Sequence, residues 1–365
     1  MKNTFGNSVA TTIYGESHGE AIGVVIDGLA PGIPVDRDFI DAQLTLRRPS
    51  GKISTARQEQ DEYRLVSGVF EGKTTGTPLC IVIPNTQTRS KDYSATRALA
   101  RPGHADYTAY CKYHGFEDYR GGGHFSGRIT AGLVAAGAIA LTALHGKGIL
   151  IGTHIKRCGG VEDRAFGDLS ADITALSTMP FAVLDKVASE EMYTRMEAVA
   201  AEGDSIGGLL ETAVIGMPAG VGEPWFDTVE GVLSHALFSI PAIKGVQFGD
   251  AFDLIDAKGS EYNDPFRMEN GEVTVKTNHN GGINGGITNG APITFRCAVK
   301  PTPSIYKEQD TVDFFKNEDA KLQIHGRHDP AIIHRARVVV DSVTALVLCD
   351  VLAGRFGTDW LRSNE

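Results

Sequence analysis

Two long runs of apolar residues dominate the pattern of this chain. Residues 129–144 consist almost wholly of Ala, Leu, Val, Ile and Gly, and residues 338–352 are nearly as apolar. A run that is apolar all round predicts a helix that is buried on every side. The β-rich stretches 205–216, 242–249 and 293–299 are suited to provide that cover. The sequence therefore predicts central helices packed between sheets.

Shorter patterns surround these runs without a regular alternation of strand and helix. Residues 24–26 and 79–83 predict short strands, and residues 36–46 predict a helix capped by Asp36. The acidic segment 185–201 predicts a solvated surface helix. Neither a repeat of about 20 to 50 residues nor a linker rich in Pro and Ser interrupts the chain. We therefore expect residues 1–365 to form a single domain.

Composition narrows the class of protein. The chain has 365 residues, of which 42% are hydrophobic and 22% charged, as in ordinary globular proteins. Its five cysteines form no Cys-x-x-Cys pair, which favours reduced thiols and no zinc site. The N-terminus lacks a long apolar core, and no uncharged apolar stretch reaches the roughly 18 residues of a membrane helix. We expect a cytoplasmic protein that is not embedded in a membrane.

Charge is distributed unevenly along the chain. The net charge of -10 argues against a general nucleic-acid binder, because such proteins usually carry a basic face. Between Arg47 and Arg128, however, 13 Lys and Arg stand against 8 Asp and Glu, so this segment is +5 and the remainder -15. A basic island in an acidic protein suits a small anionic ligand, whereas the plainer alternative is chance clustering on a solvated face.

Two histidine turns are candidates for proton transfer. His18 stands between Gly15 and Gly19, where glycines permit a tight backbone that exposes the imidazole. His104 follows a Pro-Gly turn and precedes Asp106, which is suited to cap a helix. Taken alone, each histidine is as readily an ordinary polar turn residue.

Several further segments are suited to bind anions. The pair at 47–48 offers guanidinium groups that either interact with a helix C-terminus or grip carboxylate and phosphate. Residues 121–128 place three glycines before a buried helix, an arrangement that holds anions, although neither the Walker nor the Rossmann spacing is present. The Asn- and Gly-rich stretch 278–290 favours a binding loop over a merely flexible one. Segments 300–305 and 326–330 combine cations with hydroxyl, imidazole and carboxylate groups.

Taken in order, these motifs resemble the chorismate synthase family over essentially the whole chain. The resemblance implies an α+β fold, a β-α-β sandwich with central buried helices between antiparallel sheets, and a homotetramer. It implies a lyase that uses reduced FMN to convert 5-enolpyruvylshikimate 3-phosphate to chorismate and phosphate, the final step of the shikimate pathway. The reaction would be an anti 1,4-elimination without net oxidation, for which an electron-rich flavin supplies the difficult step.

The resemblance also implies roles for individual residues. His18 would protonate the departing phosphate, His104 would maintain the protonation state of the reduced flavin, and Asp329 would interact with the flavin ring. The residues implied to contact FMN are Ser126, Gly127, Gly285, Lys300, Pro301, Thr302, Pro303, Ser304 and Arg327. The residues implied to face substrate anions are Arg48, Arg128 and Arg335. No metal ion is implied.

One motif departs from the family pattern. After the triple glycine the family commonly reads Arg-Ser-Ser-Ala-Arg, whereas this chain reads His124-Phe125-Ser126-Gly127-Arg128. One cation and one hydroxyl are thereby lost, so we expect altered contact with the flavin phosphate. A protonated His124 would replace the lost cation.

Two other classes of protein remain as alternatives. A non-catalytic protein that binds flavin or a phosphorylated ligand would keep the glycine loops but would not need His18, His104 and Asp329. A phosphotransferase is disfavoured, because the chain has no Walker loop and no carboxylate pair suited to magnesium. Since no separate nicotinamide domain is evident, we expect an external flavin reductase rather than reduction of FMN by this chain with NADPH.

Overall fold

Two five-stranded antiparallel sheets frame the protein, and the computed structural model describes residues 2–49, 51–54, 60–86, 97–324 and 329–362. The first sheet has the order β1-β2-β3-β7-β4 and the second β11-β16-β10-β8-β9. Strands of the first sheet are Thr4–Phe5 (β1), Ala10–Gly15 (β2), Ala21–Asp27 (β3), Leu79–Pro84 (β7) and Arg64–Ser67 (β4). Strands of the second are Ile243–Phe248 (β11), Ile293–Val299 (β16), Gly208–Ile215 (β10), Leu150–Cys158 (β8) and Val161–Glu162 (β9).

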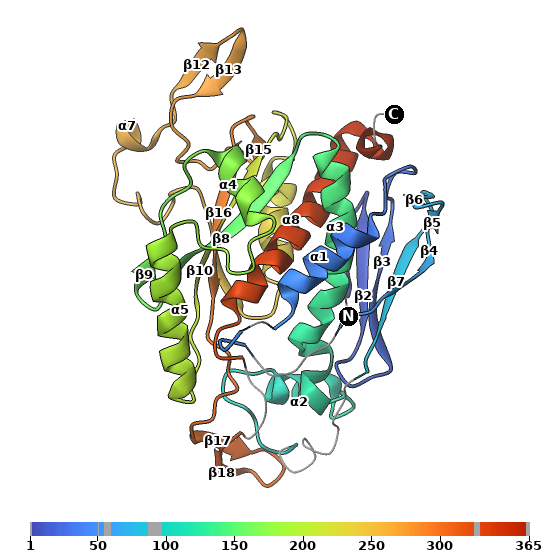
Figure 1. The fold of residues 1–365 in the computed structure, drawn as a ribbon, viewed down its shortest axis with the longest axis vertical. Coiled ribbons are helices and arrows are strands. Elements are labelled where there is room, and N and C mark those ends of the chain that lie inside the picture. Colours follow the sequence, from blue (N-terminus) through green and yellow to red (C-terminus); the bar gives the residue numbers. More distant parts are fainter. Residues whose placement is uncertain (1, 50, 55–59, 87–96, 325–328, 363–365) are drawn as a thin grey trace.

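Helices fill the space between the sheets (Figure 1). Helix α3 packs against β3 and β7, α8 packs against β8 and β10, and the two helices pack against each other. The α-helices are Arg37–Arg47 (α1), Asp106–Tyr113 (α2), Thr130–His145 (α3), Leu169–Leu176 (α4), Lys186–Ala201 (α5), Val229–Leu237 (α6), Gly259–Tyr262 (α7) and Ile333–Phe356 (α8). Short 3₁₀ turns are Arg120–Phe125 (η3), Gly127–Ile129 (η4), Trp225–Asp227 (η5) and Thr358–Leu361 (η6). The α+β class is confirmed.

Four small hairpins complete the described chain. Their strands are Val69–Phe70 (β5) with Lys73–Thr74 (β6), Phe266–Glu269 (β12) with Glu272–Val275 (β13), Ile283–Asn284 (β14) with Ile287–Thr288 (β15), and Gln309–Asp313 (β17) with Glu318–Leu322 (β18). The hairpin β12–β13 projects from the end of the molecule (Figure 1). The β14–β15 hairpin lies within the Asn- and Gly-rich stretch, so this segment has defined secondary structure.

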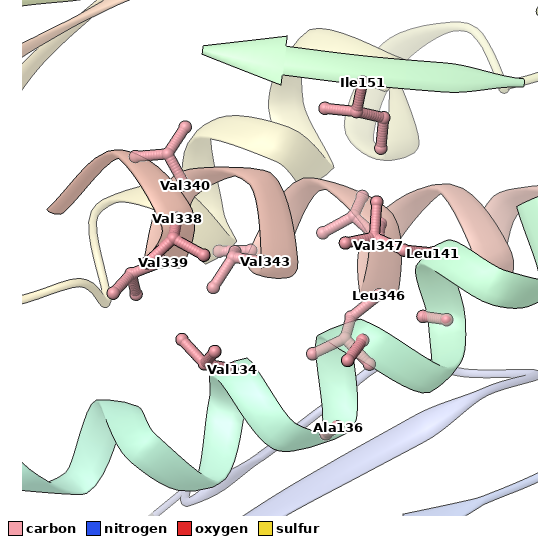
Figure 2. Packing of buried hydrophobic residues seen from close by; sticks show 14 of the residues in the cluster. Val134, Ala136, Leu141, Ile151, Val338, Val339, Val340, Val343, Leu346 and Val347 are labelled. Carbon is pink, nitrogen blue, oxygen red and sulfur yellow. The ribbon is translucent and has the colours of Figure 1, made fainter. Parts of the chain in front are cut away.

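The core joins both sheets to the central helices. Alternate residues of β7 and β16 are buried, as expected for strands with one face on a core. Figure 2 shows Val339 and Val343 of α8 directed toward Val134 of α3. The helices approach closely at Gly137, where an added Cβ would lie 2.5 Å from Ser342 Cα. A glycine is therefore required at this contact.

Most predicted elements are confirmed, and the differences have physical causes. Helix α1 is capped by Asp36, whose side chain accepts a hydrogen bond from Phe39 N. Helix α8 begins earlier than the apolar run predicted, because its first turns carry charged residues that are nevertheless buried. The N-cap of α2 is Ala105 rather than Asp106, because the carboxylate of Asp106 binds other side chains.

Candidate active site

A cavity of about 1010 Å³ lies where the first turns of α3 and α8 approach the loops before α2 and after β16. One wall is apolar and includes Leu133, Val339 and Val343. The polar and small residues that line the rest include Arg47, Asp61, Gly103, His104, Gly121, His124, Ser126, Gly127, Arg128, Lys300, Thr302, Pro303, Ser304, Asp329 and Arg335. A cavity with an apolar wall and a few polar groups is typical of a small-molecule site.

A buried carboxylate joins two of the arginines in the lining. Asp61 Oδ2 lies 2.9 Å from Arg47 Nη2, and Asp61 Oδ1 forms an ion pair with Arg128 Nη1. Burial alone would raise the pKa of Asp61, but the two guanidinium charges outweigh it and lower the pKa. Asp61 is therefore held as an anion between two cations.

Arg128 is anchored by further contacts with the protein. Its Nε donates to Asn85 Oδ1 at 3.0 Å, and its Nη2 donates to the carbonyl of Pro84 at 3.3 Å. Arg47, in contrast, has an Nε that is buried without a hydrogen-bond partner. Both arginines nevertheless line the cavity.

A second ion pair stands at the start of α8. Arg335 Nη1 pairs with Asp329 Oδ2, and Arg335 Nε donates to the carbonyl of Arg47 at 2.7 Å. Burial lowers the pKa of the Arg335 guanidinium, while Asp329 opposes this effect. The hydrogen bond to Arg47 connects α8 to the end of α1. Arg335 thus lines the same cavity as Arg47 and Arg128.

His104 faces the cavity from a rigid support. Its Nδ1 lies 2.9 Å from Asp106 Oδ1, and Arg101 donates to the same oxygen at 2.6 Å. Burial of Asp106 would raise its pKa, but the hydrogen bonds from Arg101 and His104 outweigh burial and hold it well below its usual value. Nδ1 of His104 also lies 3.1 Å from Arg101 Nη2, so both Asp106 and Arg101 hold this nitrogen, and Nε2 is directed toward Gly122.

The expectation that the glycines expose the His18 imidazole is wrong: His18 is almost fully buried behind the triple-glycine loop and is outside the cavity lining. An added Cβ at Gly121 would collide with the His18 ring. Gly121, Gly122 and Gly123 all have positive φ, a conformation that side chains disfavour. The glycines therefore allow the loop to pass between His18 and the cavity.

The segment after β16 supplies hydroxyl groups to the lining. Thr302 Oγ1 is buried without a hydrogen-bond partner, and Ser304 is buried nearby in the chain. Lys300 Nζ donates to the carbonyl of Gly103, which connects this segment to the His104 turn. Pro301 is outside the lining.

Two other predicted contacts, Arg48 and Gly285, are not brought to the cavity lining, and a third falls on a residue that the structure does not describe. Arg48 donates to the carbonyl of Gln60 and is replaced in the lining by Arg47. Gly285 lies in the β14–β15 hairpin and is also outside the lining. Arg327 lies outside the described residues. Roles for these three residues stay predictions.

Arg47 and Asp61 are two of the lining residues that the sequence did not single out individually. Ile40, Leu44 and Arg47 are spaced to share one face of α1, and all three are buried. This spacing is a signal that distinguishes Arg47 from Arg48. Asp61 has no comparable local signal, because its partner Arg128 is distant in sequence.

In the described ranges, no three His, Cys, Asp or Glu side chains are grouped so as to hold a metal ion. By length and composition the helical stretch Gly127–His145 could cross a membrane, but 83% of its apolar window is buried inside the protein. That degree of burial is typical of a core helix.

Comparisons with known proteins agree over nearly the whole chain. The chorismate synthase family profile matches residues 9–353. A chorismate synthase of Thermococcus kodakarensis is 43% identical over 350 residues, which cover 96% of this chain and 97% of the relative. One from Lachnospira eligens is 46% identical over 351 residues, covering 96% and 94% respectively.

A solved structure agrees with this relationship. A crystal structure of chorismate synthase superposes with a TM-score of 0.74 at 27% identity, covering 97% of this chain and 94% of the other. The sequence matches thus extend through the strands and helices that form the cavity. The chain therefore belongs to the chorismate synthase family and is a lyase of that type.

Proposed function

We propose that this chain converts 5-enolpyruvylshikimate 3-phosphate to chorismate and phosphate by anti 1,4-elimination, using reduced FMN without net oxidation. Membership of the family supports the final step of the shikimate pathway. The observation that carries the specific reaction is the gathering of three arginines, His104 and the hydroxyl-bearing segment after β16 around one cavity. These groups suit a phosphorylated dicarboxylate next to a flavin.

The charges at the arginine end match a polyanionic substrate. The substrate carries one phosphate and two carboxylates, and among the described residues Arg47, Arg128 and Arg335 gather around the carboxylates of Asp61 and Asp329. Arginine binds carboxylate and phosphate through paired N–H donors. These arginines orient the substrate and stabilise the charge that develops on the leaving phosphate.

The residues present also fit a flavin. Thr302 Oγ1 is a buried hydroxyl without a partner, and Gly127 has open space where a Cβ would be. Ser126, Lys300, Thr302 and Ser304 would hold the cofactor beside the apolar wall. When bound, reduced FMN supplies the electron density that an anti 1,4-elimination needs.

The two histidines would perform different tasks. His104 has Nδ1 fixed by Asp106, so its Nε2 can exchange a proton with a group in the cavity. His18 is held behind Gly121 and would protonate the departing phosphate. Asp329 is kept in place by Arg335 and would orient the bound flavin.

Anaerobic mixing tests this function. Protein with reduced FMN and 5-enolpyruvylshikimate 3-phosphate is expected to produce a transient change in the flavin spectrum together with release of phosphate. Stopped-flow absorbance and a phosphate assay measure the two signals. Binding of reduced FMN and substrate without either signal would instead indicate a non-catalytic binding protein.

Further properties of the family complete the proposal. The layered sheets and helices would be the family's β-α-β sandwich, formed by residues 1–365 as one domain. The enzyme would act in the cytoplasm as a homotetramer, with FMN reduced by an external flavin reductase. Light scattering tests the tetramer, and failure of NADPH alone to support turnover tests the need for a reductase.

A further inference from the structure

Two hydrogen bonds join the loop that carries His18 to the triple-glycine loop. His124 Nδ1 lies 2.7 Å from the carbonyl oxygen of Gly15, and Ser17 N donates to the carbonyl of Gly123 at 3.0 Å. The bonds are made by the residues three positions before and one position before His18. The two bonds therefore fix the backbone immediately before His18.

The bond to Gly15 also requires a hydrogen on Nδ1 of His124. A carbonyl oxygen only accepts hydrogen bonds, so Nδ1 of His124 carries the hydrogen in this geometry. Gly15 ends β2, where its backbone pairs with Ile22 of β3. His124 thus connects the loop to a point already fixed by the first sheet.

Packing makes the position of the His18 ring sensitive to this connection. The ring lies against Gly121 so closely that an added Cβ would collide with it. Ser17 Oγ would lie 3.1 Å from the same Cβ. A small shift of either loop would therefore displace the imidazole.

We propose that His124 is a positioning residue for His18. Its Nδ1–H donates to Gly15 and holds the 15–19 loop in register with the triple-glycine loop. This role rests on the proposed function only in that His18 transfers a proton during turnover. The hydrogen-bonded connection between the two loops is a property of the folded chain, and it can be measured without an activity assay.

Two substitutions separate the hydrogen bond from the bulk of the side chain. His124→Asn keeps an N–H donor close to the position of Nδ1, whereas His124→Phe keeps a planar ring and removes the donor. Loss of alignment by about 1 Å can cost roughly 100-fold in rate. We expect the Phe variant to lose about 10- to 100-fold in kcat with little change in KM, and the Asn variant to stay within about threefold of wild type.

Amide hydrogen exchange provides a readout that does not depend on activity. The Ser17 amide donates to Gly123, so its protection reports whether the two loops remain joined. We expect faster exchange at Ser17 in the Phe variant and wild-type exchange in the Asn variant. If the Phe variant does not fold, His124→Ala is measured in its place.

The outcomes are distinct. Wild-type kcat and Ser17 exchange in both variants would overturn the proposal, as would equal loss of kcat in both variants with unchanged exchange, which would indicate direct contact with a ligand. Normal turnover of His18→Ala, combined with faster Ser17 exchange in the Phe variant, would refute the proton-transfer role of His18. That last result would still show that His124 joins the two loops.

Discussion

Replacing His104 with alanine is expected to lower kcat by about 10²- to 10⁴-fold, the range for loss of a general acid or base. The imidazole lines the cavity, and Asp106 and Arg101 hold its Nδ1, which leaves Nε2 for a bound group. Alanine removes the titratable group without changing the backbone turn. Single-turnover kinetics with reduced FMN measure the chemical step directly.

A control histidine separates this effect from general disturbance. His114 is exposed at the C-cap of α2 with φ 57°, a conformation that Asn tolerates well. His114→Asn is expected to keep wild-type turnover. Near-normal turnover of His104→Ala, with wild-type folding, would discredit a proton-transfer role for His104.

Replacing Asp61 with Asn is expected to lower the free energy of unfolding by about 3–5 kcal/mol, the usual cost of removing one partner from a buried ion pair. The substitution leaves Arg47 and Arg128 as adjacent buried cations without their shared anion. Asp61 has φ 52°, which Asn also adopts readily, so backbone strain does not contribute. Denaturant unfolding measures the change.

The stabilisation by Asp61 should depend on pH with a definite sign. Its pKa is lowered in the folded state, so its contribution is present above the ordinary carboxyl pKa and is lost as pH falls through the folded pKa. The difference between wild type and Asp61→Asn should therefore shrink in acid. Asp204→Asn, which breaks the exposed pair with Lys307, is the control and should cost about 0–1 kcal/mol. Equal stability of the two variants would show that the buried ion pair of Asp61 contributes no more than the exposed pair.

The central helices could be predicted from the sequence because a long run that is apolar all round indicates a buried helix. The runs at 129–144 and 338–352 correspond to α3 and α8. The first turns of α8 could not be predicted in this way. Arg337 is charged but buried and pairs with Asp341, while the partly buried Arg335 pairs with Asp329. Burial of a charge depends on a partner that local pattern does not identify.

The candidate site was predictable in part for a similar reason. His104 and the segment 300–304 belong to local motifs that reach the cavity with their neighbours. Which of Arg47 and Arg48 reaches the cavity depends on which face of α1 is buried. The spacing of Arg47 from the apolar residues of α1 could have indicated that it lies on this face. Asp61 depends on a tertiary contact with Arg128 and had no local signal.

Counting products per flavin under anaerobic conditions tests whether this chain eliminates phosphate without consuming the reduced flavin. A limiting amount of reduced FMN, saturating substrate and no added reductant should yield equal amounts of chorismate and phosphate. Many turnovers per flavin are expected, with the flavin still reduced at the end, because the elimination involves no net oxidation. Folded protein that binds reduced FMN and substrate but releases no phosphate, or that oxidises one flavin for each product, would contradict the proposed elimination without net oxidation.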